Sequence, residues 1–235
     1  MNVFQRHTVR PHVYEETGSL LRLFPVSLLI VLIAWFCFEV AAAKLRDQVG
    51  DLDQRVIVLL RGSDDSARLI GPRVLEELMR DFTALGGYGV LVIVVISYSI
   101  LLRLVHGRSD TNFFLWTAGG GFLCSSVMKT LVGRDRPGVV PHLSYVESSS
   151  FPSTHAMMST IVFLTIGLLL ARHTRDRSIR LLLVLLPLGL TFLVGISRVC
   201  MGVHFPTDVL AGWTAGLLWT WAAFSLRPPH SSQAR

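Results

Sequence analysis

The chain is poor in charge: only 16% of its 235 residues are Asp, Glu, Lys or Arg, against about 25% in soluble domains. Hydrophobic residues make up 51% of the chain, and the mean hydropathy is +0.53. This composition excludes an ordinary soluble globular enzyme and favours an integral membrane protein. The length of the chain is typical of one domain.

Acidic residues are fewer than basic ones, 16 against 22, which gives a formal net charge of +6. A basic chain can bind nucleic acid through a positive face. Here, however, the arginines lie between hydrophobic runs, where membrane topology and anion binding explain them better. We therefore expect no nucleic-acid partner.

Cysteine is also scarce, with three residues, Cys37, Cys124 and Cys200, in or beside apolar runs. Their odd number and the lack of a C-x-x-C pair argue against a disulfide framework. They give no information about the redox compartment of the protein.

Long hydrophobic runs, by contrast, are abundant. A helix needs about 20 mostly apolar residues to cross a bilayer. Six runs approach this length: residues 23–43, 86–104, 113–128, 155–171, 179–195 and 206–226. They predict an all-α fold, a polytopic membrane bundle of about six transmembrane helices. The first run ends in Val40-Ala41-Ala42-Ala43, which resembles a signal-peptidase site, so the sequence leaves both its cleavage and its retention open, although its length favours retention.

The segment 44–81, between the first and second runs, also has a helical pattern. Its apolar residues recur at helical spacing in two groups: Leu52, Val56, Leu59 and Leu60, then Val74, Leu75, Leu78, Met79 and Phe82. The second group follows Gly71-Pro72, and proline suits the first turn of a helix. We therefore expect amphipathic surface helices here, which either lie on the outer membrane surface or pack against the spans.

The distribution of arginine predicts the orientation in the membrane. The N-terminal tail, the turns at 103–112 and 172–180, and the C-terminal tail hold eleven arginines against four acidic residues, whereas segment 44–81 has seven basic and eight acidic residues. By the positive-inside rule, both termini are then cytoplasmic in a bacterial inner membrane. The predicted organisation is a cytoplasmic tail (1–22), a transmembrane domain (23–227) and a second cytoplasmic tail (228–235).

Three short clusters fall on the opposite, periplasmic side. They read Lys129-x6-Arg136-Pro137, then Pro152-Ser153-Thr154-His155, then Ser197-Arg198-x5-His204-x3-Asp208. Arginine offers a planar fork of donors to phosphate, and lysine a compact charge. Ser153 and the start of the helix behind it add further donors. The clusters therefore predict a phosphate site, with Lys129, Arg136, Ser153, Thr154 and Arg198 as ligands.

His204 and Asp208 are four residues apart, so they share a face if both lie on one helical turn. The carboxylate would fix the tautomer of the imidazole and leave the other nitrogen free to attack phosphorus. His155 is then a candidate general acid. Taken singly, each of these residues also has an ordinary explanation: interfacial histidines, cations that snorkel to head groups, a serine N-cap and a first-turn aspartate.

The three clusters together resemble the type 2 phosphatidic acid phosphatase (PAP2) family, which also includes vanadium haloperoxidases and bacterial acid phosphatases. The family pattern is K-x6-R-P, P-S-G-H and S-R-x5-H-x3-D, which this chain matches at Lys129, Arg136, Pro137, Pro152, Ser153, His155, Ser197, Arg198, His204 and Asp208. Thr154 stands where the family has glycine, which puts the shape of the phosphate pocket and the activity in question. The resemblance implies that His204 is the nucleophile, Asp208 its orienting residue and His155 the acid. It also implies that the enzyme needs no metal or other cofactor.

We therefore expect an integral membrane phosphatase of lipid phosphate or diphosphate esters that forms a phosphohistidine. Undecaprenyl diphosphate is the favoured substrate. Phosphatidic acid, phosphatidylglycerol phosphate and a lipid A phosphatase or phosphotransferase activity are alternatives. Two further alternatives are a vanadate-dependent haloperoxidase and a catalytically impaired protein that only binds lipid phosphates. The sequence leaves the oligomeric state open.

Overall fold

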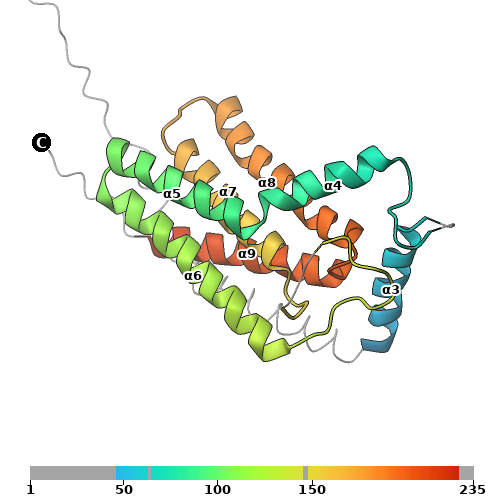
Figure 1. Cartoon of the computed structure of the whole chain (residues 1–235). Helices are drawn as coiled ribbons and strands as arrows, with labels where there is room; N and C mark the ends of the chain where they lie inside the picture. The colour runs from blue at the N-terminus through green and yellow to red at the C-terminus, as the bar shows by residue number, and fades with distance from the viewer. Residues whose placement is uncertain (1–45, 63–64, 145–147, 228–235) are drawn as a thin grey trace, which may run out of the picture. The chain divides into compact units, whose positions relative to one another are not determined.

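Seven α-helices make up most of the part of the chain that the computed structural model describes, which is residues 46–62, 65–144 and 148–227 (Figure 1). They are α3 (Arg46–Leu59), α4 (Arg73–Leu85), α5 (Tyr88–Val105), α6 (Arg108–Val132), α7 (Thr154–Ala171), α8 (Arg177–Cys200) and α9 (Pro206–Leu226). In these residues the only β-type pairing is an isolated bridge between Arg61 and Leu69. The prediction of an all-α fold is confirmed.

Four of these helices, α5, α7, α8 and α9, are long and apolar enough to cross a membrane. They correspond to four of the six predicted runs, and a polytopic helical membrane bundle is therefore confirmed. Run 113–128 falls within α6, whose 25 residues include glycine, serine and threonine and are less apolar than those of the other four. Run 23–43 and both predicted tails lie outside the described residues.

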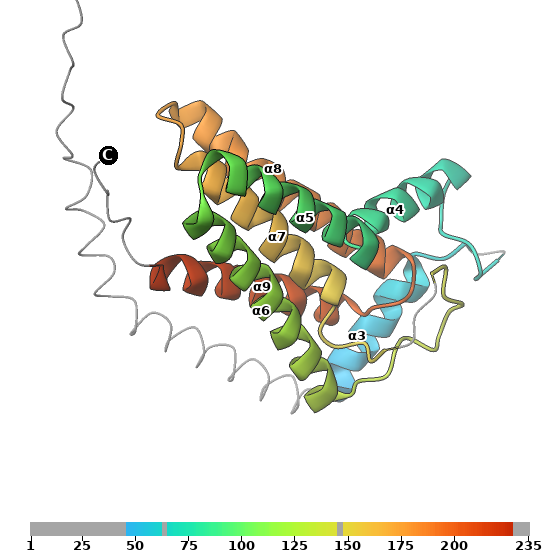
Figure 2. The ribbon, with the colours of Figure 1, turned by 60° about the vertical axis from the view of Figure 1, so that its left-hand side comes forward.

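Helix α7 is the centre of the bundle. It packs against α5, α6, α8 and α9, and 72% of it is buried (Figures 1 and 2). A helix that is apolar on all sides is expected to be buried in this way. Glycine on α9 allows a close approach, because a Cβ atom at Gly212 would lie 2.7 Å from the carbonyl oxygen of Ser153. The chain just before α7 and the start of α9 are thus held in contact.

Helices α3 and α4 occupy the segment in which the sequence predicted amphipathic helices. Leu75 and Phe82 of α4 pack against a buried apolar cluster that includes Met201, which agrees with the second of the two alternatives, packing against the spans. In α3, however, the apolar stripe points outward: Leu52 and Leu59 are 61% and 72% exposed. The buried face of α3 carries Asp53 and Ile57 instead, four residues apart. The periodicity correctly predicted a helix. The contacts of Asp53 with Arg134 and Thr207, however, turn the face of α3 that carries Asp53 toward the bundle.

The elements that carry the three sequence clusters meet at one end of the bundle. Figure 2 shows that α6 ends, α7 begins, α8 ends and α9 begins on the side where α3 lies. Helix α8 is longer than the predicted run 179–195, because it continues to Cys200 through a buried final turn. Ser197 and Arg198 therefore project from a helix inside the bundle and not from a surface loop.

Candidate active site

A pocket of about 480 Å³ lies where these helix ends meet. Its walls come from the α4–α5 junction, the end of α6, the start of α7, the end of α8 and the loop before α9. The lining residues are Thr83, Ala84, Gly87, Tyr88, Lys129, Arg136, Ser144, Ser148, Thr154, His155, Arg198 and His204. Residues from all three sequence clusters therefore share one cavity.

Arg136 is held at the pocket wall by three contacts. Its Nε donates to the carbonyl oxygen of Ser148 at 2.7 Å, and its Nη1 donates to that of Val203 at 2.6 Å. The same Nη1 lies 3.3 Å from Nε2 of His204. Burial lowers the pKa of Arg136 below its ordinary value, and the Asp208 carboxylate opposes this shift. The guanidinium is thus fixed beside the imidazole nitrogen that faces the pocket.

The other two cations are positioned from different helices. Lys129 Nζ, at the end of α6, donates to the carbonyl oxygen of Ser149 at 2.5 Å, and Ser149 Oγ donates back to the carbonyl oxygen of Lys129. Arg198 is only 2% exposed, and its Nη1 donates to Thr83 Oγ1 on α4 at 3.0 Å. Its Nε is buried and has no hydrogen-bond partner among the described residues. Three cations therefore line one cavity, and some of their N–H groups remain available to bind an anion.

His204 is 1% exposed and lies between Arg136 and Asp208. Its Nδ1 is 3.6 Å from Asp208 Oδ2, beyond the usual hydrogen-bond distance. Burial lowers the pKa of His204 to about 3, the proximity of Asp208 opposes that shift, and the charge of Arg198 reinforces it. The imidazole is therefore neutral at physiological pH, the form in which it can act as a nucleophile.

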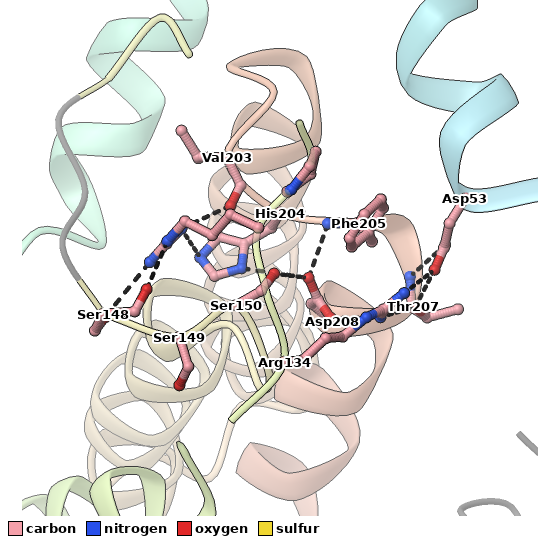
Figure 3. Close-up of polar contacts among 12 residues, drawn as sticks. Asp53, Arg134, Ser148, Ser149, Ser150, Val203, His204, Phe205, Thr207 and Asp208 are labelled. Carbon is pink, nitrogen blue, oxygen red and sulfur yellow. Dashed lines mark hydrogen bonds and ion pairs between the residues drawn. The ribbon is translucent and has the colours of Figure 1, made fainter. Parts of the chain in front are cut away.

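Asp208 is fully buried at the start of α9 and accepts several hydrogen bonds (Figure 3). Its Oδ2 accepts from the backbone N–H of Phe205 at 2.8 Å and from the hydroxyl of Ser150. Its Oδ1 accepts from Nη1 of Arg134 at 2.7 Å. A buried carboxylate needs such donors to remain ionised. Asp208 lies behind His204 and does not line the pocket.

The second cluster begins α7, and its residues differ in what they face. His155 lines the pocket, with its ring centroid 6.3 Å from that of Tyr88. Ser153 is fully buried, its backbone N–H donates to the carbonyl oxygen of Asp208, and its Oγ has no partner among the described residues. Thr154 Oγ1 lies 3.1 Å from Oγ of Ser125 on α6. The threonine that replaces the family's glycine thus directs its hydroxyl at a neighbouring helix.

Three consecutive serines before this cluster escaped the sequence analysis. Each contacts a different part of the site: Ser148 holds Arg136, Ser149 holds Lys129, and Ser150 holds Asp208. Serine is common in loops, so its type alone gave no signal. The available hint was their position, because the three serines stand one residue before the Pro152-Ser153-Thr154-His155 cluster.

Arg134 also lies in a place that the sequence did not indicate. It is one of the six unspecified residues between Lys129 and Arg136, so the motif assigns it no role. The structure instead places its guanidinium between Asp208 and Asp53, over the ring of Phe205. Asp53 had no role in the sequence analysis, and its only signal was that it shares a helix face with Ile57.

Comparisons with known proteins agree with this geometry. The sequence profile of the PAP2 superfamily matches residues 111–231. Phosphatidylglycerophosphatase B of Bacillus subtilis is 33% identical over 195 residues, which cover 83% of this chain and 90% of that protein. Lipid A 1-phosphatase of Rhizobium johnstonii is 25% identical over 209 residues, covering 81% and 74%. The crystal structure of a transmembrane PAP2-type phosphatidylglycerolphosphate phosphatase from Bacillus subtilis superposes with a TM-score of 0.71 at 29% identity, over 86% of this chain and 94% of that one.

Proposed function

Because this chain belongs to the PAP2 superfamily and is a phosphoric ester hydrolase of membranes, we propose that it removes a phosphate from a membrane lipid in the pocket described above. One observation supports this most directly. Lys129, Arg136 and Arg198 line the same cavity as the two histidines, although they come from separate elements. A phosphate monoester carries up to two negative charges, which such a set of cations neutralises.

The geometry supports a reaction in two steps. Nε2 of His204 attacks phosphorus, a P–N bond forms, and the P–O bond to the lipid breaks. His155 donates a proton to the departing alkoxide. The same residue then accepts a proton from a water molecule, whose oxygen attacks phosphorus as the P–N bond breaks and inorganic phosphate forms. Asp208 stabilises the positive charge that the imidazole of His204 gains in the first step.

The relatives change the order of the candidate substrates. The sequence favoured undecaprenyl diphosphate, whereas the Bacillus subtilis relative that is 33% identical and the Bacillus subtilis crystal structure that superposes on 86% of this chain are both named for phosphatidylglycerol phosphate. We therefore propose phosphatidylglycerol phosphate as the first candidate and undecaprenyl diphosphate as the second. Phosphatidic acid and a lipid A phosphate remain further candidates, the latter because one relative is a lipid A 1-phosphatase.

We also propose that the pocket opens toward the periplasm of a bacterial inner membrane. Helices α5 and α7 end, and α6 and α8 begin, at the end of the bundle away from the pocket. There the rings of His106 and His173 lie 4.0 Å apart. The two arginine-rich turns, 103–112 and 172–180, therefore lie side by side. Positive charge at that end supports a cytoplasmic location for it.

Phosphate release from a panel of lipids tests the proposed function. The full-length protein in detergent is assayed with phosphatidylglycerol phosphate, undecaprenyl diphosphate, phosphatidic acid and a lipid A 1-phosphate in mixed micelles. We expect turnover of at least one lipid and its loss in His204→Ala. Binding of the lipids without release of phosphate would instead support a protein that has lost catalysis, and full activity in His204→Ala would disprove the nucleophile.

A further inference from the structure

Behind Asp208, on the side away from the pocket, one arginine joins two carboxylates. Arg134 Nη1 donates to Asp208 Oδ1 at 2.7 Å, and Arg134 Nη2 donates to Asp53 Oδ2 at 2.9 Å. Both carboxylates are buried, with side chains that are 0% and 2% exposed, and the arginine side chain is 29% exposed. Figure 3 shows the guanidinium between the two carboxylates, on the side of Asp208 away from His204.

Further contacts leave this arginine little freedom. Its Nη1 also donates to Thr207 Oγ1 at 2.8 Å, and its Cζ lies 4.2 Å from the ring centroid of Phe205. Asp53 is fixed in turn, because the backbone N–H of Thr207 donates to its Oδ1 at 3.2 Å and Thr207 Oγ1 donates to its Oδ2 at 2.5 Å. Asp53 comes from α3, more than 150 residues before Thr207, so the network ties a distant helix to the first turn of α9.

The network matters because of which oxygen each donor binds. Asp208 Oδ2 faces His204 and also accepts from Ser150 and from the backbone of Phe205. Among the described residues, Oδ1 accepts its hydrogen bond from Arg134. Without the guanidinium, one oxygen of a buried carboxylate loses its donor. The group then turns toward other donors or takes up a proton, and either change removes the alignment with His204.

We propose that Arg134 and Asp53 are positioning residues for the reaction. They set the plane of the Asp208 carboxylate, so that Oδ2 faces Nδ1 of His204, and they make turnover depend on the docking of α3. This inference rests on the proposed function of the pocket. The competing explanation is that the ion pairs only attach α3 to the bundle, in which case they contribute to stability and not to the chemical step.

Kinetics of charge-removing variants separate the two explanations. The variants are Arg134→Met, Arg134→Lys, Asp53→Asn and the double variant Arg134→Met/Asp53→Asn, assayed as full-length protein on phosphatidylglycerol phosphate in mixed micelles. Arg80→Met is the matched control, because it removes an exposed arginine–glutamate pair of 2.7 Å on the outer helix α4. Thermal unfolding of each variant is recorded in the same detergent, and kcat is measured well below its midpoint.

We expect Arg134→Met to lower kcat roughly 10- to 100-fold with little change in KM, because misplacing a reacting group by about 1 Å can cost about 10²-fold. The kcat of Arg134→Lys should lie between those of Arg134→Met and the wild type, since an ammonium group cannot hold two carboxylates as a planar guanidinium does. The double variant should be no slower than Arg134→Met, because both changes break the same chain of contacts.

The positioning role is overturned if Arg134→Met and Asp53→Asn unfold at lower temperature but keep the kcat of Arg80→Met. The proposed function would fail in a different way, with His204→Ala as active as the wild type. If His204→Ala is inactive while Arg134→Met keeps its kcat, the function stands and only the positioning role is lost.

Discussion

Nδ1 of His204 faces Oδ2 of Asp208 at 3.6 Å, and the carboxylate already accepts from the backbone N–H of Phe205 and from Ser150. Catalytic hydrogen bonds of this kind often tighten only when the substrate is bound. Phe205 and Ser150 thus fix the position of the carboxylate even while its distance to the imidazole is long. The first three predictions below depend on this arrangement and on the cations around it.

Asp208→Asn should lower kcat by roughly 10²- to 10⁴-fold, the range for loss of a positioned acid–base partner. The amide cannot stabilise the charge that His204 gains, and its NH₂ group offers the wrong polarity to the donors around it. Steady-state kinetics on the substrate identified in the panel give the result. Wild-type kcat in a folded Asp208→Asn protein would show that the carboxylate has no part in the reaction.

His204 should make the folded protein less stable as the pH falls. In the unfolded chain its pKa is about 6.5, whereas burial lowers the pKa to about 3 in the folded state. Between these values the unfolded state binds a proton that the folded state does not, so the free energy of unfolding decreases as the pH falls, by up to about 1.4 kcal/mol per pH unit.

The test of this effect is thermal unfolding of the wild type and His204→Gln at pH 7 and pH 5. The variant lacks the titrating group, so its midpoint should fall less between the two pH values. Parallel decreases in both proteins would show that His204 keeps an ordinary pKa in the folded state.

Chelators should not affect phosphate release. Lys129, Arg136 and Arg198 already supply the positive charge that a metal ion provides in other phosphatases. We expect equal rates with and without EDTA in metal-free buffer. Loss of activity in EDTA, with recovery on addition of Mg²⁺, would contradict this role for the three side chains.

Thr154→Gly should cost stability and leave catalysis nearly intact. The change removes the 3.1 Å contact with Ser125 and places glycine in the first turn of α7, which together cost about 1–2 kcal/mol. Thermal unfolding and kcat are measured on the same preparation. A large increase in kcat in Thr154→Gly would mean that the threonine side chain obstructs the phosphate.

Gly212→Ala should separate α7 from α9. The added Cβ would lie 2.7 Å from the carbonyl oxygen of Ser153, and such overpacking costs about 1–3 kcal/mol. The matched control is Gly189→Ala, because a Cβ at this helical position meets no atom within 4 Å. We expect a lower unfolding midpoint and slower turnover for Gly212→Ala alone. Equal midpoints for the two variants would show that the helices can move apart freely.

The sequence predicted those features that depend on local patterns. The hydrophobic runs gave α5, α7 and α9 with small errors at their ends, because helical spans are set by apolar length, whereas α8 continues past its predicted run to Cys200. Residues of the three clusters were assigned to one site, and the structure brings Lys129, Arg136, His155, Arg198 and His204 to one pocket. Their roles in catalysis stay a prediction until the variants are measured.

Contacts between distant segments could not be read in the same way. Asp53 and Arg134 are 81 positions apart, and nothing in the sequence around either residue indicates the other. The apolar stripe of α3 left open whether Leu52 and Leu59 face the membrane surface or the spans, and the structure leaves both exposed. The orientation of α3 follows instead from the buried carboxylate of Asp53, which needs the partners that Arg134 and Thr207 supply.

The buried position of α7 limits where substrate preference can evolve. Most substitutions along this helix would disturb its packing against four other helices, so the end of the bundle that carries the pocket is hard to vary. The α4–α5 junction is different, because Ala84 and Tyr88 line the cavity and are exposed. If the pocket binds substrate as proposed, its preference can therefore diverge at this junction while the buried part of the pocket stays the same.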